Sequence, residues 1–551
     1  MNTFRYIFTA AASCMAATAL ACTGLIAAPG ATADGSTLVT YAADSHTLYG
    51  ELYHSPAADH PKGTMRKVVE WDTGKLLGEI PQAAHTYTTI GNMNEHGLAI
   101  TESTWGGRHE LAGSGMIDYG SLIYITLERA RTAREALKVM TSLVDTYGYA
   151  SEGESFTIAD PEEVWIMELI GKGKEDKGAV WVARRVPDDC ISGHANHSRI
   201  HRFPLNDKSG HTIYSPDVIS FARSKGYFSG KDEDFSFSRA YAVYDGGALR
   251  GCDGRVWSFY NRYASDMDKY LSWVLKGEGE PLPLWIKPET KLTAADMKEM
   301  MRDHFEGTPM DMTLDAGAGA YKVPYRWRPL TYEVDSVTYT HERAIATQQT
   351  GFSLVAQLRK DVPEAMKGIL WFGVDDANTC VYIPMYSCLT KAPHEFAVGN
   401  GDLYTLKWDA AFWVTNFVAN QAYNRYSQMI PDIRAVQRPM EQTIEEEVAT
   451  LYSEVADLDP EVAVNLLNNH ASDWSKRYTD RYRQLGEYLF VKYLDGNIKK
   501  ERDGKFARTE TGMPESPEFG GYDERYYRSI AEDPDGGERL KLLILPEEEN
   551  K

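Results

Sequence analysis

The chain has 551 residues, and its 43% hydrophobic and 25% charged residues are the proportions of a globular protein with a sizeable core. The formal net charge of −21 argues against nucleic acid or an anionic membrane as a partner, because both repel an acidic surface. A chain of this length forms one large domain or two to three ordinary ones.

The first 21 residues have the parts of a secretory signal peptide. Arg5 is their only charged residue, an apolar run follows through Leu20, and Ala19-Leu20-Ala21 fits an Ala-x-Ala cleavage site. The run is too short to span a bilayer, and no stop-transfer pattern follows it. We therefore expect an exported protein, periplasmic or extracellular, without an integral membrane span. Cleavage after Ala21 would make Cys22 the first residue of the mature chain.

An N-terminal cysteine carries two reactive groups on one residue. Its thiol is a nucleophile, and its α-amine, with an unperturbed pKa of roughly 7.7–8.0, can act as a base near neutral pH. A bacterial lipoprotein signal also places a cysteine first, but lipidation would block the sulfur. That signal favours leucine three residues before the cysteine, where this chain has Ala19. We expect unmodified Cys22, and a lipid-anchored surface form is the alternative.

The first predicted elements after Cys22 are two strands. Thr23–Ala28 and Thr37–Ala42 are apolar and β-branched, and the turn-forming sequence PGATADGS between them favours a hairpin. Such a hairpin would hold Cys22 at a strand end and return Asp44 close to it. A second strand pair flanks the turn Asn94-Glu95-His96-Gly97.

Helices and further strands follow along the chain. Residues 118–147 are predicted to be helical in two pieces, with a capping-box sequence at Thr132–Glu135. The runs SFTIA, VWIMELI and AVWVARRV then predict an antiparallel meander. Strand pairs, helices and more antiparallel strands in this order indicate sheets covered by helices rather than alternating βαβ units.

The second half of the chain begins with a loop-rich, aromatic region over residues 205–345, and WFGVDDANTCVYIPMY again predicts strands. From Trp408 the pattern becomes helical. One helix is expected to begin after Pro439, another at Asp459-Pro460-Glu461, and a further helical run covers Trp474–Leu494.

Cysteine and histidine spacing gives no metal signature. Four cysteines beyond Cys22 could form up to two disulfides in an exported chain or remain buried thiols: Cys190, Cys252, Cys380 and Cys388. Two histidines flank Asn196, but without an HExxH pattern they do not predict a zinc site. We expect no metal.

An ordered set of segments resembles a known family. These segments are ACTGLIAAPGATADGSTLVTYAADS, GNMNEHGLAITEST, MIDYGSLIYITLERARTAREA, SEGESFTIADPEEVWIMELIGKG, PDDCISGHANHSRI, HFEGTPMDM and RAIATQQTGFS. In this order they are similar to cysteine dipeptidases related to bacterial dipeptidase A, which are N-terminal-nucleophile hydrolases of the branch that holds penicillin V acylase and bile salt hydrolase. The resemblance implies an α+β fold, an αββα sandwich of two antiparallel sheets flanked by helices. It also implies amide hydrolysis without metal or organic cofactor.

The resemblance also suggests how the chain is divided. After the signal peptide of residues 1–21, we expect residues 22–407 to form the catalytic domain. Residues 408–500 would be a helical region packed on it, and residues 501–551 a charged tail rich in glycine and proline.

Five site residues are implied by the resemblance. Cys22 would be the nucleophile with its own amine as the base, and Asp44 would orient that amine. The side-chain amide of Asn196 and the backbone N–H at Thr104 would form the oxyanion hole. Arg239, in SFSRAYA, is a weaker match to a distal arginine of the site.

One position departs from the family pattern. Many relatives have arginine three residues before the aspartate, and this chain has Tyr41 there. A cation beside the thiol would lower its pKa. Thiolate formation must therefore rely more on the α-amine or on another positive group.

The implied function is that of an exported cysteine dipeptidase that cleaves small peptides through a thioester acyl-enzyme. The alternatives are an N-acyl amidohydrolase of the penicillin V acylase or bile salt hydrolase type, and a lipidated surface protein without activity. An exopeptidase needs a counter-charge for the substrate's free amine. Several acids can supply it, Glu102 among them. The sequence also allows a homo-oligomer.

Overall fold

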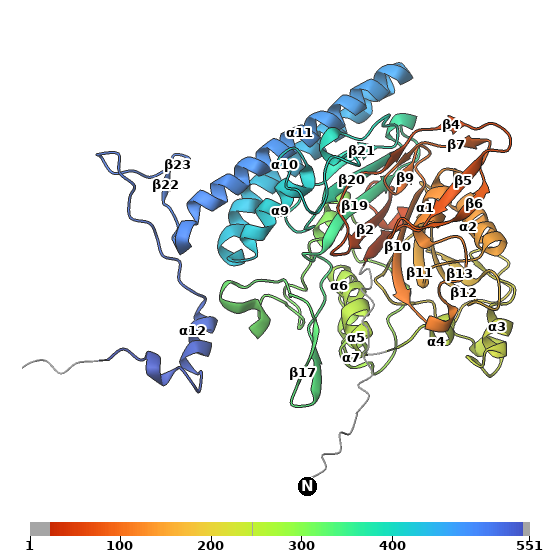
Figure 1. Cartoon of the computed structure of the whole chain (residues 1–551), viewed down its shortest axis with the longest axis horizontal. Helices are drawn as coiled ribbons and strands as arrows, with labels where there is room; N and C mark the ends of the chain where they lie inside the picture. The colour runs from red at the N-terminus through yellow and green to blue at the C-terminus, as the bar shows by residue number, and fades with distance from the viewer. Residues whose placement is uncertain (1–21, 245, 544–551) are drawn as a thin grey trace, which may run out of the picture.

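The computed structural model describes residues 22–244 and 246–543. The predicted signal peptide lies outside the described residues. Two antiparallel sheets form the centre of the molecule (Figure 1).

The first sheet has seven strands in the described part of the chain. In spatial order they are β16 (Trp285–Ile286), β14 (Ile191–His194), β1 (Gly24–Ala27), β2 (Thr37–Asp44), β19 (Thr350–Leu358), β20 (Gly368–Val374) and β21 (Ile383–Tyr386). β1 and β2 pair antiparallel, and the backbones of Thr23 and Ala42 exchange hydrogen bonds of 3.2 and 2.9 Å just beyond β1. The predicted hairpin is therefore confirmed.

The second sheet has eight strands within the described ranges. Their order is β15 (Thr212–Tyr214), β13 (Ala179–Arg185), β12 (Val164–Gly171), β11 (Gly153–Ala159), β10 (Ala99–Gly106), β9 (Met93–Asn94), β8 (Thr89–Ile90) and β3 (His54–Ser55). β11, β12 and β13 form the predicted meander. β2 packs against β10 and β11, so the two sheets lie face to face.

Helices cover the outer face of each sheet. α1 (Tyr119–Leu127) and α2 (Ala133–Tyr147) pack on β10 and β11. On the other side, α6 (Gly254–Tyr263) and α8 (Ala294–Met300) pack on β14 and on β2 and β19, respectively. α9 (Ala411–Ala422), α10 (Tyr426–Ala456) and α11 (Pro460–Lys492) contact β20 and β21. The predicted αββα sandwich with a helical C-terminal region is confirmed (Figure 1).

Burial follows from this layering. Every residue of β2 and of β19 is buried, because one face meets the other sheet and the opposite face meets helices. Strands covered on both faces are apolar on both faces, which explains why runs such as TLVTYAA lack strict alternation.

Two helical predictions need correction. α10 does not begin after Pro439 but runs from Tyr426 and contains both Pro431 and Pro439. A proline inside a helix costs about 3 kcal/mol, but the first turns of α10 bury Met429 and Ile433 against the body, and this burial offsets the cost. The region predicted to be rich in loops also holds α6, α8 and four further helices of seven residues or fewer, α3 (Val218–Ser224), α4 (Phe237–Tyr241), α5 (Gly246–Ala248) and α7 (Leu271–Lys276).

The remaining elements are small. They are the strand pairs β4 (Ala58–Asp59) with β7 (His85–Thr86), β5 (Met65–Val69) with β6 (Leu76–Pro81), β17 (Thr331–Val334) with β18 (Val337–Thr340), and β22 (Glu501–Arg502) with β23 (Lys505–Phe506), together with α12 (Glu524–Ala531). No helix among the described residues has the length and apolar character to cross a bilayer. The five described cysteines are unpaired.

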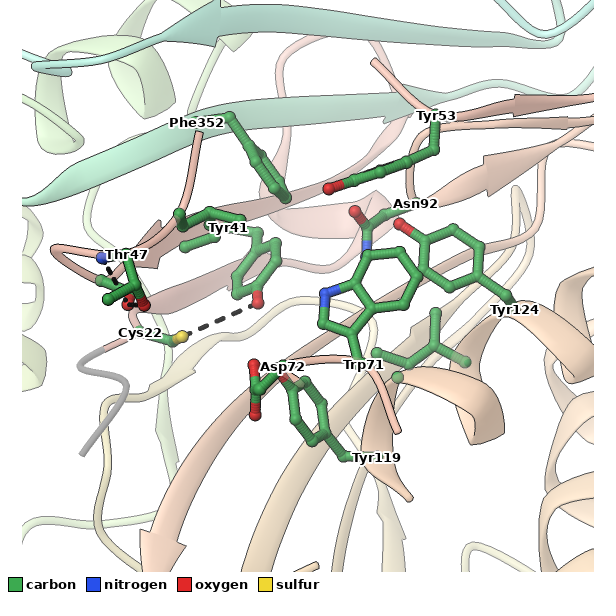
Figure 2. Close-up of a pocket in the computed structure, with 15 residues that line it drawn as sticks. Cys22, Tyr41, Thr47, Tyr53, Trp71, Asp72, Asn92, Tyr119, Tyr124 and Phe352 are labelled. Carbon is green, nitrogen blue, oxygen red and sulfur yellow. Dashed lines mark hydrogen bonds between the residues drawn. The ribbon is translucent and has the colours of Figure 1, made fainter. Parts of the chain in front are cut away.

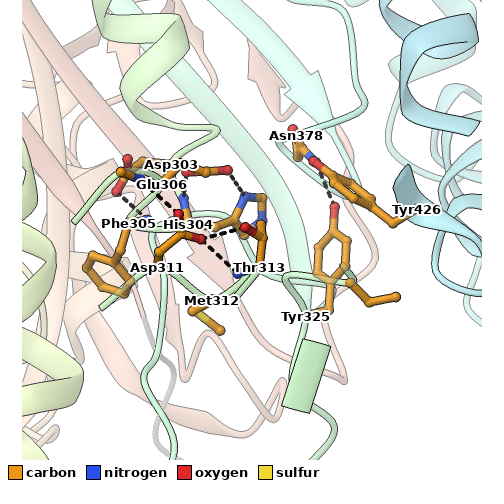
Figure 3. Close-up of polar contacts among 12 residues, drawn as sticks. Asp303, His304, Phe305, Glu306, Asp311, Met312, Thr313, Tyr325, Asn378 and Tyr426 are labelled. Atoms are coloured by element: carbon orange, nitrogen blue, oxygen red, sulfur yellow. Dashed lines mark hydrogen bonds and ion pairs between the residues drawn. The ribbon is translucent and has the colours of Figure 1, made fainter. Parts of the chain in front are cut away.

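Figure 3 shows polar contacts within the HFEGTPMDM segment and, beside it, those of Tyr325, Asn378 and Tyr426, the first residue of α10. His304 Nδ1 lies 3.1 Å from Glu306 Oε1, and the backbone N–H of His304 donates to Glu306 Oε2 at 2.7 Å. Beside it, Asn378 donates to the hydroxyls of Tyr325 and Tyr426, both at 3.0 Å. This segment is therefore part of the support for the fold and lies outside the cavity described next.

Candidate active site

Cys22 stands at the N-terminal end of β1, beside a cavity of about 300 Å³ (Figure 2). Its side chain is only 1% exposed. The cavity is lined by Cys22, Tyr41, Ala43, Ser45, Thr47, Leu48, Tyr53, Trp71, Asp72, Asn92, Tyr119, Gly120, Ile123, Tyr124 and Phe352. Besides Cys22, these residues come from β2 and the loop after it, the turns between β5 and β6 and between β8 and β9, α1 and β19, so the cavity forms only when the layers are assembled.

The sulfur has two polar neighbours. Cys22 Sγ donates to Glu102 Oε1 at 3.3 Å, and it lies 3.7 Å from the hydroxyl of Tyr41. That hydroxyl donates to the same Glu102 oxygen. Burial, and then the charges of Glu102 and Asp44, raise the pKa of the thiol well above 9. The resting residue is therefore a thiol, and attack on a substrate requires a base that removes its proton.

Glu102 forms a buried carboxyl pair with Glu154 on the neighbouring strand β11. The two carboxyl groups interact directly, neither is exposed, and Glu102 Oε2 and Glu154 Oε1 receive no hydrogen bond from another group in the described part of the chain. A hydrogen bond between two carboxyl groups requires a proton on one of them. Burial, followed by the charge of Glu102, raises the pKa of Glu154 well above its ordinary value. Glu154 therefore holds the shared proton, and Glu102 carries the negative charge that faces the sulfur.

Asp44 ends β2 and is fully buried. Its carboxylate accepts a hydrogen bond from the hydroxyl of Thr350 at 2.6 Å and pairs with the guanidinium of Arg343. A backbone hydrogen bond from Asp44 to the sulfur acts to lower the thiol pKa, against the effect of burial. Asp44 thus lies next to Cys22, as the predicted hairpin requires.

Asn196 and Thr104 lie together and are linked to Cys22 through Arg255. Asn196 Nδ2 donates to the backbone carbonyl of Thr104 at 2.6 Å, and its Oδ1 accepts from Arg255 Nη2 at 2.8 Å. The backbone of Asn196 is left-handed, with φ of 57°, a conformation that asparagine tolerates better than most residues. These contacts hold the side-chain amide in one orientation.

Arg255 is a part of the site that the sequence prediction missed. It lies in α6, is buried, and donates to the carbonyl oxygen of Cys22 at 2.7 Å and to Thr23 Oγ1 at 2.6 Å. Arg239, the predicted arginine, lies instead on α4 with an exposed side chain over the ring of Tyr244. The structure brings Cys22, Asp44, Asn196 and Thr104 together, and it places Arg255 rather than Arg239 beside them.

Weak signals for Arg255, and for the place of Glu102 beside the sulfur rather than as a counter-charge for the substrate, are present in the sequence. Arg255 precedes the apolar run VWSF at the start of a helix, and Glu102 is the charged residue in the strand AITEST. A charged residue in an apolar element is buried only when it has partners. Neither pattern says where those partners are, because they come from other layers.

The arrangement supplies a nucleophile on the cavity wall, a carboxylate that accepts its hydrogen bond, and an oriented side-chain amide linked to Cys22 through Arg255. That combination suits attack on a carbonyl carbon followed by stabilisation of the oxyanion that forms.

Comparisons with known proteins point to one family. The family model of peptidase family C69 matches residues 21–439. A probable dipeptidase from Salmonella dublin is 25% identical over 388 residues, which cover 67% of this chain and 81% of the relative. A probable dipeptidase from Latilactobacillus sakei is 24% identical over 488 residues, which cover 84% of this chain and 94% of the relative. A dipeptidase from Bifidobacterium longum is 26% identical over 285 residues, 48% of this chain and 47% of the relative.

Proposed function

The chain belongs to peptidase family C69, and we propose that it is an exported dipeptidase whose nucleophile, Cys22, becomes N-terminal when the leader is removed. Membership makes the protein a cysteine-type peptidase. The observation that carries the proposal is the position of the Cys22 sulfur, on the wall of the cavity and 3.3 Å from Glu102.

The proposed reaction begins with loss of the thiol proton. After leader removal the α-amine of Cys22 takes this proton, and Glu102 holds the thiol in position until then. The sulfur attacks the scissile carbonyl carbon and forms a tetrahedral oxyanion. The side-chain amide of Asn196 and a backbone N–H near Thr104 are the proposed donors to it, and loss of one such donor typically costs about 10²–10³ in rate.

Collapse of this intermediate breaks the C–N bond, and the leaving amine takes the proton held by the α-amine. The acyl group stays on the sulfur as a thioester. Water then adds to the thioester carbonyl and gives a proton to the α-amine, and the sulfur leaves as the free acid forms. Asp44 supports both steps in this proposal, because its buried carboxylate lies beside Cys22 and stabilises an ammonium there.

The direct test compares the exported wild-type protein with its Cys22→Ala and Cys22→Ser variants on a panel of dipeptides. We expect kcat/KM to fall by about 10³-fold or more in both variants. Cys388→Ala is the matched control, because it removes another unpaired cysteine outside the cavity lining, and it should keep full activity.

Intact mass and N-terminal sequencing of the same preparation test the leader removal. A free cysteine at the first position supports the proposal. A lipid adduct on Cys22, or full activity of Cys22→Ala, would contradict it. Cleavage of N-acyl amino acids without cleavage of dipeptides would favour the acylase alternative.

A further inference from the structure

The Cys22 cavity has one carboxylate on its wall among the residues that the structure describes, and this is Asp72. The other lining side chains, the Cys22 thiol included, are neutral, and no lysine, arginine or histidine is among them. The rings of Tyr53, Trp71 and Tyr124 pack on one another, with Trp71 and Tyr124 stacked at 4.6 Å between centroids. The cavity therefore combines an aromatic wall with a single negative charge.

Asp72 is held in place at the turn between β5 and β6. One carboxylate oxygen accepts a hydrogen bond from the hydroxyl of Tyr119 at 2.8 Å. The backbone N–H of the preceding Trp71 donates to Asp118, the N-cap of α1, at 2.8 Å. These contacts tie the turn to α1 and fix the carboxylate, which stays exposed to an incoming ligand.

Figure 2 shows the Asp72 carboxylate next to the Tyr119 ring, on the part of the cavity that also holds the Cys22 sulfur and the Tyr41 hydroxyl. Asp72 and Cys22 line the same cavity, and the charge of Asp72 acts on Glu102, which lies 3.3 Å from the sulfur. In a peptide with a free N-terminus, the first α-amine is only two bonds from the carbonyl carbon that a dipeptidase attacks. A group that binds this amine must therefore lie near the nucleophile.

Asp44 and Glu102 are the other acids near the sulfur, and both are poorly placed to bind a substrate amine. Asp44 is fully buried, does not line the cavity and is paired with Arg343. Glu102 has a similar position. It is fully buried, does not line the cavity, and is already engaged by Cys22, Tyr41 and Glu154. Asp72 has an exposed carboxylate in the cavity wall instead.

We propose that Asp72 binds the free α-ammonium group of the substrate's first residue and so selects peptides with an unmodified N-terminus. This inference rests on the proposed function. The side chain of that first residue lies against Tyr53, Trp71 and Tyr124, which favours apolar and aromatic residues there. Because no cation lines the cavity among the described residues, the C-terminal carboxylate of a dipeptide points out of it.

The test uses paired compounds that differ only at the amine. Phenylalanyl-glycine and its N-acetyl derivative are the substrates, and phenylalanine chloromethyl ketone and its N-acetyl derivative are labels for the Cys22 thiol. Alkylation of Cys22, followed by mass spectrometry, does not require hydrolysis. It reports amine selection even if the proposed dipeptidase activity fails.

The variant Asp72→Asn removes the charge and keeps the shape. We expect its preference for the free-amine compound over the N-acetyl compound to fall by about 10- to 100-fold, in both kcat/KM and labelling rate, because the ammonium group loses a negatively charged hydrogen-bond acceptor. Glu70→Gln is the matched control. Glu70 lies two residues away, outside the cavity lining, and accepts a hydrogen bond from Thr73. This control should keep the preference of the wild type.

Three results would overturn the inference. One is equal labelling of the wild type by the free and acetylated reagents. Another is a uniform loss in Asp72→Asn for both members of each pair, which would make Asp72 a support for the β5–β6 turn. The last is the same loss of preference in Glu70→Gln. If dipeptides are not cleaved but labelling still prefers the free amine, the proposed function fails while the role of Asp72 stands.

Discussion

At the scale of single residues, the site depends on negative charges kept close to a neutral thiol. Glu102 and Asp44 both raise the pKa of the Cys22 thiol, although burial contributes most. In relatives with arginine at the place of Tyr41, a cation would act the other way. Tyr41 instead donates a hydrogen bond from its hydroxyl to Glu102, and the sulfur has no cationic neighbour at this position. This environment suits a nucleophile that stays protonated until its base is in place.

The charge of Glu102 can be tested by titrating the thiol. Glu102→Gln removes a negative charge beside the sulfur, and since that charge raises the thiol pKa, the pKa should fall. The rate of iodoacetamide alkylation at Cys22 should therefore reach half its maximum at a lower pH than in the wild type.

Glu154→Gln is the control with the opposite prediction. It takes away the carboxyl group that shares a proton with Glu102 and leaves the charge on Glu102, so the alkylation curve should not move to lower pH. A downward shift in both variants, or in neither, would contradict the assignment of the charge to Glu102.

Residue patterns predicted some parts of the site and could not predict others. Cys22 and Asp44 belong to one hairpin, so their proximity follows from local sequence. Arg255 comes from a helix 233 residues further along the chain, and Asp72 from a turn that only tertiary packing brings to the cavity. The roles carried over from the family for Asn196 and Thr104 stay predictions, although the structure places them together.

At the scale of elements, His194 links the two sheets. It belongs to β14 in the seven-stranded sheet, and its ring nitrogens lie 2.6 Å from the hydroxyl of Ser103 and 2.7 Å from that of Thr157, in β10 and β11 of the other sheet. A Cβ atom on Gly24 would lie 2.8 Å from the His194 ring, so glycine is required where β1 passes the ring. Cys22 therefore lies two residues before Gly24, which packs tightly against the histidine that joins the two sheets.

This contact predicts a pH dependence of stability. Burial, and then the charges of Arg199 and Arg255, lower the pKa of His194 to about 3 from an ordinary value of 6.5. As the pH falls below 6.5, His194 binds a proton in the unfolded chain but not in the folded chain. Stability is therefore lost from pH 6.5 downwards until the pKa of His194 in the folded chain is reached. Between pH 7.5 and 4.5 this one group accounts for a loss of about 2–3 kcal/mol.

Urea unfolding at these two pH values provides the measurement. The variant His194→Gln should be less stable than the wild type at pH 7.5 but should lose less free energy of unfolding on acidification. The exposed His211→Gln is the control and should follow the wild-type curve. An equal loss in wild type and His194→Gln would contradict this role of His194.

At the scale of the whole molecule, the layers could be predicted because their elements follow one another in the sequence. The meander β11–β13 and the pair α1–α2 each have short connections and clear periodicity. The start of α10 could not be predicted, because Pro431 and Pro439 are local helix breakers. The helix continues through them because its apolar side chains are buried against the rest of the protein. The short helices of the middle region are missed for a similar reason, since packing rather than local propensity stabilises them.

The C-terminal arm, residues 497–543, extends away from the sandwich (Figure 1) and should be dispensable for catalysis. None of the residues of α12 is buried, and Phe519 is 81% exposed. The arm meets the body through surface contacts such as Lys322 with Asp523 at 3.2 Å, a kind of ion pair worth about 0–1 kcal/mol. We expect a chain that ends at Asn497 to keep kcat/KM within about twofold and its thermal midpoint within a few degrees of the full-length protein, since few apolar contacts are lost.

A cut before α11 is the contrasting truncation. It removes the buried Tyr478 and Tyr482 and should abolish folding. If the shorter truncation also unfolds the protein, the arm contributes to the core in a way that these surface contacts do not explain.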